Sequence, residues 1–323
     1  MRDIGIEYPA RGEMRFFELG PPPAPRATEI LIETRFSGIT NGTERHALVG
    51  DHGWGRYPGR HGYQHVGQVA AAGGEVRQFA VGDWVFYGQY VGHRGWHIVD
   101  VGEGEGSDAG AHLTIKLPDD VDRSECALLG VAGVGLRGVK RIRVRPGHKV
   151  WVAGAGPIGN FSAQCARALG AQVTVTDIVR HRLEVARETG AWQALPASDD
   201  GAWKALEDAG PFDRIIDACS AESLFHDIYH HQLLARGGVI AAMAVRDEAR
   251  FPWGLLHGTE ASIEVACHFS CQELRELIGY LRSGEIRIAP LISHRAPIDS
   301  APEIYALLRD RPHELLGVAF EWQ

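Results

Sequence analysis

The sequence predicts an α/β fold made of a β-rich, barrel-like domain and a doubly wound parallel sheet. Three observations support this prediction. Residues 1–125 contain many glycines and short alternating runs, a pattern typical of strands separated by turns. From residue 149 to 245, apolar strands alternate with helical segments of about 10–15 residues, which indicates a parallel sheet with helices on both faces. A glycine-rich turn joins the first of these strands to the helix that follows it.

The first half of the chain is expected to consist mainly of strands. Strands are expected over residues 29–39 and 67–76, and a turn followed by an apolar strand is expected over residues 81–88. The segment GEGEGSDAG, residues 102–110, is predicted to be an acidic, flexible loop. Short strands with frequent turns favour a compact β-rich domain here.

The pattern changes near Asp122, where apolar residues begin to recur at helical spacing. A helix is expected over residues 123–142, with Ser124 as its N-cap. The elements expected after it are, in order, a strand at 149–153, a helix at 157–171, a strand at 172–177, a helix at 180–190, a strand at 212–220, a helix at 223–238, a strand at 239–245, two helices at 271–284 and 301–310, and a last strand at 317–322.

Composition restricts the class of protein. A chain of 323 residues exceeds one typical core, so two domains are expected, and 45% apolar with 23% charged residues is typical of a folded globular protein. The formal net charge of −8, without long runs of one sign, argues against nucleic acid or an anionic membrane surface as partner. No apolar run approaches the roughly 18 residues of a membrane span, and the N-terminus lacks an apolar signal region, so a cytoplasmic location is expected. Five scattered cysteines are poor material for disulfides.

The segment GAGPIG has the G-x-G-x-x-G spacing of a dinucleotide-binding turn, and it lies between an expected strand and an expected helix. Gly154 permits the tight turn, Gly156 lets a pyrophosphate approach the backbone, and Gly159 lets helix and strand pack closely. Pro157 and Ile158 begin the helix, whose free N–H groups would face the phosphates. The alternative is that the segment is only a strand–helix turn.

An acid at the end of the next strand bears on which dinucleotide binds. Asp177 lies 18 residues after Gly159, where a carboxylate accepts hydrogen bonds from the adenosine ribose and repels a 2′-phosphate. NAD is therefore favoured over NADP. Arg180 and Arg182 follow closely, so NADP remains the less favoured option, and Arg182 is expected to belong to the cofactor site.

Several short motifs together resemble the medium-chain dehydrogenase/reductase superfamily. They are Gly38–Ile39, Gly42–Thr43–Glu44, GYQHVGQV at 62–69, VGDWV at 81–85 and GAGPIG at 154–159. The resemblance covers nearly the whole chain. It implies a nicotinamide-dependent oxidoreductase with its cofactor in the cleft between two domains, and it implies a homodimer or homotetramer.

The same resemblance implies a division of the chain into two domains. Residues 1–130 and 269–323 would form a GroES-like catalytic and substrate domain. Residues 131–268 would form a Rossmann dinucleotide-binding domain. The partner implied is a small-molecule substrate.

The cysteine and histidine ligands of zinc-dependent members are missing. Their three positions fall on Thr40, Tyr63 and Val131, with Asn41 as an apparent one-residue insertion. These side chains do not supply the thiolates and imidazole that a catalytic zinc requires in this family. Residues 84–125 contain no cysteine, so the structural-zinc lobe is missing as well. The sequence resembles a zinc-free branch with a GTE motif, distantly like the bacteriochlorophyllide dehydrogenases, and no metal site is predicted.

The resemblance also implies a path for the hydroxyl proton. Thr43 matches the hydroxyl of the family's proton relay and His46 matches its histidine. Tyr63 replaces a zinc ligand, so its hydroxyl is expected to donate to the substrate oxygen, since a phenol of ordinary pKa stays protonated at neutral pH. Thr40 or Asn41 would supply a second donor.

Other roles are open for these residues. Glu44 is expected to pair with an arginine and hold the loop. For His46 the alternative is contact with the cofactor without proton relay, and for Tyr63 it is filling the space left by zinc. A metal site of histidines, alone or with a glutamate, is a further alternative. The histidines available for it are His46, His61, His65, His93 and His97.

The function predicted is a zinc-independent, NAD(H)-dependent oxidoreductase that interconverts a secondary alcohol, such as a sugar, cyclitol or other polyol, with its ketone. An NADPH-dependent enoyl or quinone reductase is one alternative, and a non-catalytic NAD(H)-binding sensor or partner protein is another. The side chains expected around the substrate are Trp54, Tyr57, Tyr90, His93 and Trp96.

Overall fold

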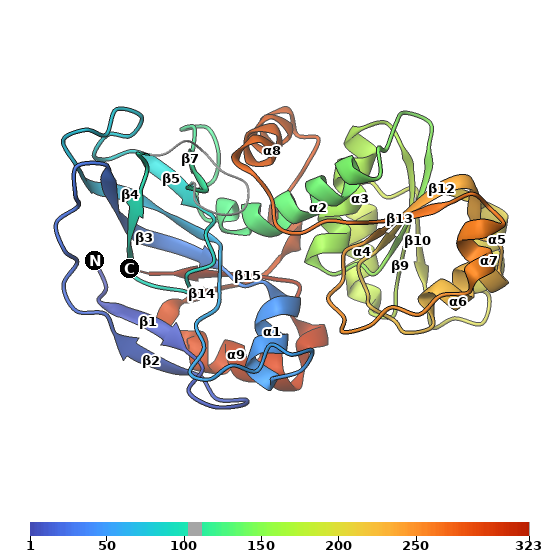
Figure 1. Cartoon of the computed structure of the whole chain (residues 1–323), viewed down its shortest axis with the longest axis horizontal. Coiled ribbons are helices and arrows are strands. Elements are labelled where there is room, and N and C mark those ends of the chain that lie inside the picture. The colour runs from blue at the N-terminus through green and yellow to red at the C-terminus, as the bar shows by residue number, and fades with distance from the viewer. Residues whose placement is uncertain (103–111, 323) are drawn as a thin grey trace. The chain divides into compact units, whose positions relative to one another are not determined.

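The computed structural model of the protein describes residues 1–102 and 112–322, and the chain divides into two compact units (Figure 1). The first unit comprises Met1–Gly130, His268–Arg282 and Ile292–Gln323, and the second comprises Val131–Cys267 and Ser283–Leu291. The acidic loop expected at 102–110 lies outside the described residues, apart from Gly102. In the part of the chain that the structure describes, no helix is both long and apolar enough to cross a membrane.

The first unit is built mainly from strands. They are β1 (Ile4–Glu7), β2 (Arg15–Glu18), β3 (Glu29–Gly38), β4 (His65–Ala72), β5 (Trp84–Tyr87), β6 (Trp96–Asp100), β7 (Thr114–Lys116), β14 (Ile292–Pro297) and β15 (Gly317–Glu321). β1 and β2 form a hairpin-like pair. The others form a seven-stranded sheet in the order β14-β15-β3-β4-β5-β7, with β6 also paired to β3. This is the β-rich GroES-like domain that was predicted.

Alternation along β3 explains how this sheet encloses a core. Ile30 and Ile32 point the same way because successive strand residues face opposite sides, and both are fully buried against Val69, Val85 and Val99. The helices of the unit are α1 (Asn41–Val49), α8 (Cys271–Ser283) and α9 (Ala301–Asp310), with short 3₁₀ turns η1 (Glu125–Leu128), η3 (Ile298–Ser300) and η4 (Pro312–Glu314). α1 and α9 bury their apolar faces in a second core with β15, which fixes the position of α1.

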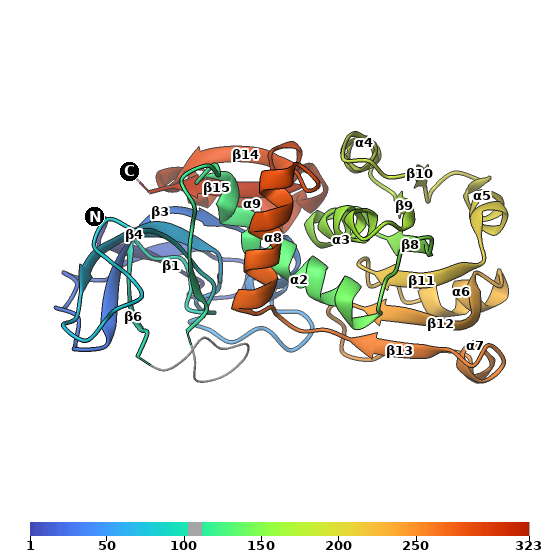
Figure 2. The same ribbon diagram turned by 90° about the horizontal axis from the view of Figure 1, so that it is seen from above.

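The second unit is a doubly wound parallel sheet. Its strands are β8 (Lys149–Ala153), β9 (Gln172–Asp177), β10 (Gln193–Pro196), β11 (Phe212–Asp217), β12 (Leu234–Ala242) and β13 (Ser262–Val265). Its helices are α2 (Leu129–Arg141), α3 (Pro157–Ala168), α4 (Arg180–Glu188), α5 (Ala202–Ala209), α6 (Leu224–His230) and α7 (Trp253–His257), with the 3₁₀ turn η2 (Ala289–Leu291). Figure 2 shows α3 and α4 on one face of the sheet and α5 and α6 on the other.

The strand order is β10-β9-β8-β11-β12-β13, and every pair is parallel. The order of connection reverses between β8 and β11. In open α/β sheets, ligands bind outside the carboxyl ends of the strands at such a switch point. The predicted Rossmann sheet is therefore confirmed, and its topology directs attention to the residues that follow β8, β9, β11 and β12.

One local prediction was wrong, and a second was right only in part. The helix expected over 223–238 ends at His230, because Gln232 adopts a left-handed conformation (φ 51°) and Leu234 then pairs with Phe212 as the start of β12. Ser124 takes the N-cap position of the 3₁₀ turn at Glu125–Leu128, but its side chain forms no capping hydrogen bond. Its hydroxyl donates to Oδ1 of Asp122 (2.6 Å), and that same oxygen accepts the N–H of Glu125 (3.0 Å).

The boundary between the units also differs from the one expected. Residues 283–291, assigned above to the first domain, belong to the second unit. The side chain of Gln164 on α3 explains this, since it donates to the carbonyl of Arg287 (3.1 Å) and accepts the N–H of Arg287 (2.8 Å). These paired bonds attach the returning chain to the second unit.

Candidate functional site

The turn between β8 and α3 can accommodate only glycine at two of its positions. Gly154 has a φ of 103°, and a Cβ there would lie 3.0 Å from the carbonyl of Ala218. A Cβ on Gly159 would lie 1.8 Å from the carbonyl oxygen of Gly154. A Cβ on Gly156, by contrast, would meet no heavy atom within 4 Å. Gly154 and Gly159 therefore serve the fold of the turn, and Gly156 leaves open space beside the backbone.

The start of α3 supplies donors for an anion beside this space. Gly156 is the N-cap and Pro157 takes the first helical position, where its missing N–H costs nothing. The N–H groups of Ile158 and Gly159 belong to the first turn, which has no intrahelical acceptors. A helix N-terminus of this kind binds phosphate through its N–H groups and its dipole. The residues present thus fit the pyrophosphate of a dinucleotide.

Asp177 is held beside the same turn by backbone donors. Its Oδ2 accepts the N–H of Ala155 (2.6 Å) and its Oδ1 accepts the N–H of Val179 (2.7 Å). A carboxylate has about four lone-pair positions, so two backbone bonds leave acceptors for ribose hydroxyls. The carboxylate is thereby fixed at the end of β9, where the sequence places a ribose-binding acid.

The two arginines after Asp177 are not equivalent. Arg180 forms an ion pair with Asp199 (2.9 Å), which offsets its charge. Arg182 is partly buried, and burial lowers its pKa while the negative charge of Asp177 opposes that shift. Arg182 therefore interacts electrostatically with Asp177, and its place in a cofactor site stays a prediction.

Sequence analysis missed an ion pair at the carboxyl ends of β11 and β12. Asp217 is fully buried, and its Oδ1 accepts the N–H groups of Ser220 (3.1 Å) and Cys219 (3.3 Å). Its Oδ2 binds the guanidinium of Arg246, which also lies over the ring of Phe225. The pair ties the loop after β11 to the loop after β12. The only signal in the sequence was an acid at the end of a third parallel strand.

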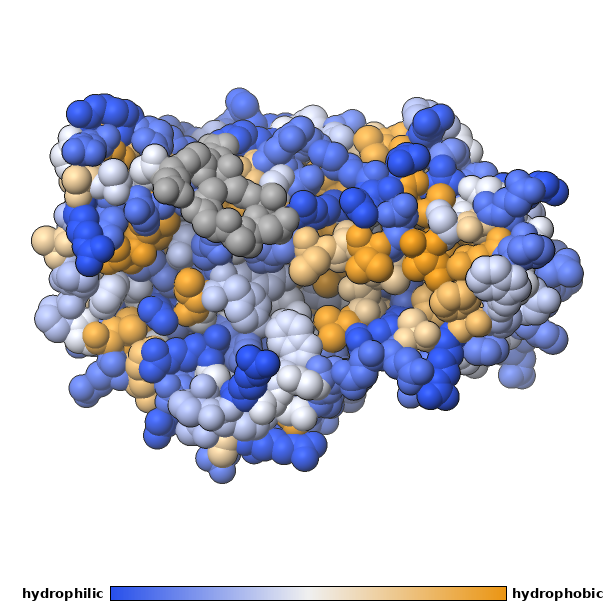
Figure 3. Space-filling view, viewed as in Figure 1, coloured by the Kyte–Doolittle hydropathy of each residue, from blue (hydrophilic) through white to orange (hydrophobic). Residues whose placement is uncertain are grey.

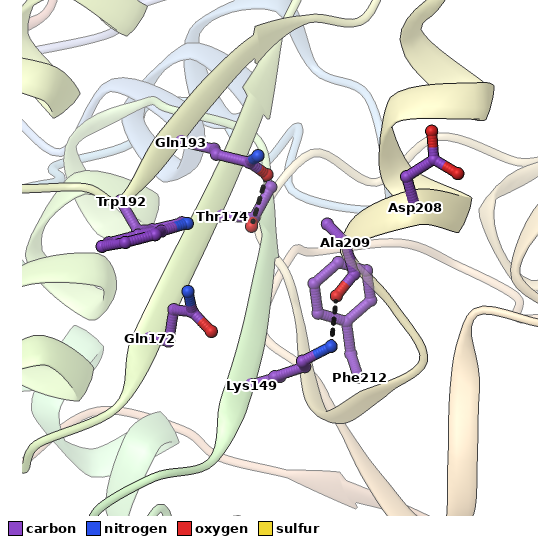
Figure 4. A pocket seen from close by; sticks show the side chains of 8 residues that line it. All are labelled: Lys149, Gln172, Thr174, Trp192, Gln193, Asp208, Ala209 and Phe212. Carbon is purple, nitrogen blue, oxygen red and sulfur yellow. Dashed lines mark hydrogen bonds between the residues drawn. The ribbon is translucent and has the colours of Figure 1, made fainter.

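A hollow of about 200 Å³ in the second unit lies at the other end of the sheet (Figure 4). Its lining includes the first residues of four strands, which are Lys149, Gln172, Gln193 and Phe212. The ammonium of Lys149 donates a hydrogen bond to the carbonyl of Ala209 (2.8 Å). Because dinucleotides bind at the carboxyl ends of such strands, this hollow is separate from the dinucleotide turn.

In the first unit, the start of α1 is held by polar contacts of Thr40 and Asn41. The N–H of Thr40 donates to Oε1 of Glu44 (2.8 Å), and the Thr40 hydroxyl accepts from Nε2 of Gln64 (3.4 Å). The amide of Asn41 donates to the carbonyl of Leu316 (3.0 Å). Thr40 is buried and its hydroxyl contacts Gln64, while the side-chain amide of Asn41 is hydrogen-bonded to the backbone.

Glu44 does not pair with an arginine, and that prediction was wrong. Its buried Oε2 accepts hydrogen bonds from the hydroxyls of Tyr305 (2.6 Å) and Tyr8 (3.4 Å) and from Nε2 of His93 (3.1 Å). Burial alone raises the pKa of Glu44, but the charge and hydrogen bond of His93 and the Tyr305 hydroxyl outweigh it, so the pKa falls below its usual value. The carboxylate anchors α1 to three other segments of the unit.

Thr43 and His46 lie on the same side of α1. They are three residues apart in the helix, so their side chains are neighbours on its surface, and both are partly exposed. Nδ1 of His46 lies 2.5 Å from Oδ1 of Asp51, and its ring centroid is 4.6 Å from that of His52. The structure thus places the two relay candidates together and adds a carboxylate that the sequence analysis did not consider.

Tyr63, which the resemblance aligns with a zinc-ligand position of the family, is packed among aromatic rings. Tyr63 is 4% exposed and stacks on Tyr90, with ring centroids 5.8 Å apart. Its ring is T-shaped to that of His268 at 5.0 Å and tilted to that of Phe269 at 5.8 Å. Trp54 also contacts Tyr90 in this cluster. The ring of Tyr63 is therefore fixed by packing.

The other side chains expected near the substrate lie in different surroundings. His93 belongs to the buried network of Glu44, and the Tyr57 hydroxyl donates to the carbonyl of Ala47 (3.1 Å). The indole of Trp96 donates to the carbonyl of Gly20 (3.2 Å). These three positions are explained by contacts that hold the first unit together.

Among the described residues, His46, Asp51 and His52 have ligand atoms within 4.8 Å of one another and could hold a metal ion. His61 and His65 are not joined in a site. His61 contacts the Tyr90 hydroxyl (2.8 Å), while buried His65 faces the carbonyl of Gly92 (3.1 Å) and has a pKa lowered by burial to about 3.

Comparisons with known proteins agree with this architecture. A family model described as an alcohol dehydrogenase GroES-like domain matches residues 26–112, and one described as zinc-binding dehydrogenase matches residues 157–282. Together with the fold and the dinucleotide turn, these matches define the class of protein. The chain belongs to the medium-chain dehydrogenase/reductase superfamily.

Similar proteins include several dehydrogenases. The sorbitol dehydrogenase of Macaca fascicularis is 34% identical over 207 residues, which cover 60% of this chain and 56% of that protein. A probable formaldehyde dehydrogenase of Bacillus subtilis is 28% identical over 285 residues, covering 79% and 80%. The match therefore spans little more than half the length of the sorbitol dehydrogenases.

Solved structures share the fold over the whole chain. An Escherichia coli oxidoreductase of unknown specificity superimposes with a TM-score of 0.86 at 20% identity, covering 99% of each chain. The 2R,3R-butanediol dehydrogenase of Bacillus subtilis gives a TM-score of 0.83 at 17% identity, again covering 99% of each chain. Likeness at these identities establishes the fold alone.

Proposed function

We propose that this protein is an NAD(H)-dependent oxidoreductase that interconverts a secondary alcohol, such as a polyol, sugar or cyclitol, with its ketone. The observation that carries the proposal is the dinucleotide turn, with Gly154 and Gly159 sterically required, open space at Gly156 and the fixed carboxylate of Asp177. The similarity to sorbitol dehydrogenases supports the choice of substrate class.

The reaction divides the alcohol into a hydride and a proton. A nicotinamide dinucleotide held at the turn after β8 would supply the acceptor for the hydride of the carbinol carbon. The hydroxyl proton needs a separate acceptor. Thr43 and His46 are neighbours on α1, so the Thr43 hydroxyl can accept the proton while handing its own to His46, which releases it to water. Neutral alcohol and oxidised cofactor thus give ketone, reduced cofactor and one proton.

The proposal assigns no role to zinc at the family's usual ligand positions. Thr40, Tyr63 and Val131 occupy those positions, and none of these side chains provides a thiolate or an imidazole. The Tyr63 hydroxyl or the Thr40 hydroxyl would take over the donation to the substrate oxygen. Part of the metal's electrostatic function would thereby pass to neutral hydrogen-bond donors.

The test is turnover by the purified protein after treatment with a chelator, followed through NADH absorbance with polyols, sugars and their ketones. Activity with NAD that survives the chelator supports the proposal. Loss of activity that zinc restores would refute metal-free chemistry. Preference for NADPH with enones or quinones would indicate a reductase of conjugated double bonds, and tight NADH binding without turnover would indicate a sensor.

The family resemblance further supports a proposal that the chain forms a homodimer or homotetramer and acts in the cytoplasm. Figure 3 shows hydrophobic residues gathered on the face of the second unit that is turned to the viewer. Large exposed apolar side chains of that unit include Ile178, Trp192, Trp253 and Val265. Light scattering after size-exclusion chromatography tests the assembly, and a single monomeric peak across the micromolar range would reject it.

A further inference from the structure

The turn that ends α1 brings an acidic residue back over the helix. Gly50 adopts the left-handed conformation (φ 68°, ψ 39°), and its N–H donates to the carbonyl of His46 (2.8 Å). The N–H of Asp51 donates to that same carbonyl (3.2 Å). A glycine at this position commonly ends a helix in this way and reverses the chain. As a result, the side chain of Asp51 meets the side chain of His46.

Neighbouring side chains keep this turn in place. The Tyr57 hydroxyl donates to the carbonyls of Ala47 and Leu48 (3.1 Å each). A Cβ at Gly50 would lie 2.7 Å from that hydroxyl, so glycine is needed there for space as well as for conformation. Nε of Arg11 donates to the carbonyl of Val49 (2.6 Å). The contact between Asp51 and His46 therefore belongs to an ordered helix end.

The contact itself determines which ring nitrogen carries the proton. Oδ1 of Asp51 lies 2.5 Å from Nδ1 of His46. An ionised carboxylate only accepts hydrogen bonds, so Nδ1 is the donor. In the neutral ring, the lone pair is then at Nε2, which is free to accept a proton. The carboxylate also stabilises the imidazolium that forms when Nε2 is protonated.

We propose that Asp51 is a positioning residue for His46, which it holds in the Nδ1–H tautomer and whose cationic form it stabilises as the proton passes through. The role rests on the proposed function, since the proton comes from the substrate hydroxyl through Thr43. The O–H bond of Thr43 breaks as Nε2–H forms, and Nε2 then returns the proton to water. Asp51 stays ionised throughout and does not touch the substrate.

The short contact favours this pairing over a metal site in the same cluster. Two ligand atoms about 2.0–2.1 Å from a tetrahedral zinc lie roughly 3.3 Å apart, which is well beyond 2.5 Å. The guanidinium of Arg45 also lies 3.9 Å from Oδ2 of Asp51, and a second positive charge nearby disfavours a bound cation. The charged and titratable groups around this helix end are Arg11, Arg45, Asp51, His52 and Tyr57.

Nitrogen-15 spectra of the whole protein test the pairing without any need for activity. The signals of His46 are identified by their loss in His46→Gln. We expect the Nδ1–H tautomer in the wild type and a mixture of tautomers in Asp51→Asn. Asp119→Asn is the matched control, because it removes an exposed carboxylate of the same unit. Identical His46 signals in the wild type and Asp51→Asn would overturn the pairing.

Kinetics then test the role. In Asp51→Asn, we expect kcat for alcohol oxidation to fall about 10- to 100-fold, with KM for NAD unchanged. The pH limb that reports the neutral base should move to lower pH, because the imidazolium loses its carboxylate. Asp51→Glu should restore part of kcat. A merely structural role would leave the pH limb where it is.

The outcomes separate this inference from the function on which it rests. No turnover by the wild type with any alcohol or ketone would refute the proposed function and the relay with it. Turnover by the wild type with an unchanged kcat and pH limb in Asp51→Asn would refute the role of Asp51 alone. Calorimetric zinc binding that is lost in both Asp51→Asn and His52→Gln would overturn the pairing in favour of a metal site.

Discussion

Replacement of Glu44 by glutamine should weaken the first unit, because the carboxylate accepts four hydrogen bonds in a fully buried position. The donors are the N–H of Thr40, the hydroxyls of Tyr305 and Tyr8, and Nε2 of His93. A glutamine keeps one carbonyl oxygen and turns the other acceptor into an NH₂ group. Whichever way the amide is turned, at least one of the donors then faces the NH₂ group and lacks an acceptor in a place that water does not reach.

The size of the effect follows from that loss. Removal of one partner of a buried charged pair costs about 3–5 kcal/mol of unfolding free energy. For a unit of this size, each kcal/mol lowers the melting midpoint by about 2–4 °C, so the expected drop is about 6–20 °C. Tyr305→Phe removes one donor and leaves the carboxylate its other partners, so it should cost only about 1–3 kcal/mol.

Thermal melts of wild type, Glu44→Gln, Tyr305→Phe and Asp119→Asn provide the measurement. Hydrogen exchange of the α1 amides shows whether the loss is in the first unit, since Glu44 lies on α1. The Asp119→Asn control should stay within about 0.5 kcal/mol of the wild type, because its side chain is exposed. A Glu44→Gln midpoint equal to that of the control would refute the reasoning.

Three further predictions concern the cofactor and pH. Gly159→Ala places a Cβ 1.8 Å from the carbonyl oxygen of Gly154, so the turn must move. NADH affinity measured by calorimetry should therefore fall at least about tenfold. Unchanged affinity would contradict the turn as the binding site. Asp177→Ser removes the charge that repels a 2′-phosphate, so the ratio of NADP to NAD turnover should rise, and a constant ratio would exclude Asp177 from that choice. Burial lowers the pKa of His65 to about 3, below its unfolded value near 6.5, so the stability that neutral His65 contributes is complete above pH 6.5 and is lost as the pH falls towards 3. His65→Gln should therefore flatten the melting temperature between pH 6.5 and 4.5, relative to wild type, and equal slopes would contradict it.

The dinucleotide turn and Asp177 were predictable because their geometry is local. Spacing of the glycines sets the path of a single strand–turn–helix, and the acid follows at the end of the next strand. The alternation of strands and helices likewise predicted the parallel sheet. Asp51 was within reach of the sequence, since it comes directly after the Gly50 that ends α1, but the sequence analysis did not consider it.

Contacts between distant parts of the chain were decided only by the tertiary structure. Glu44 was expected to pair with an arginine, yet its partners His93 and Tyr305 lie 49 and 261 residues away. The pair of Asp217 and Arg246 depends on two loops that the sheet order places side by side. Packing of whole elements brings such groups together, and no local pattern in the chain encodes which acid meets which donor. The sequence by itself determined the class of fold and the glycine turn after β8, and the folded chain determined which groups surround Thr43 and His46.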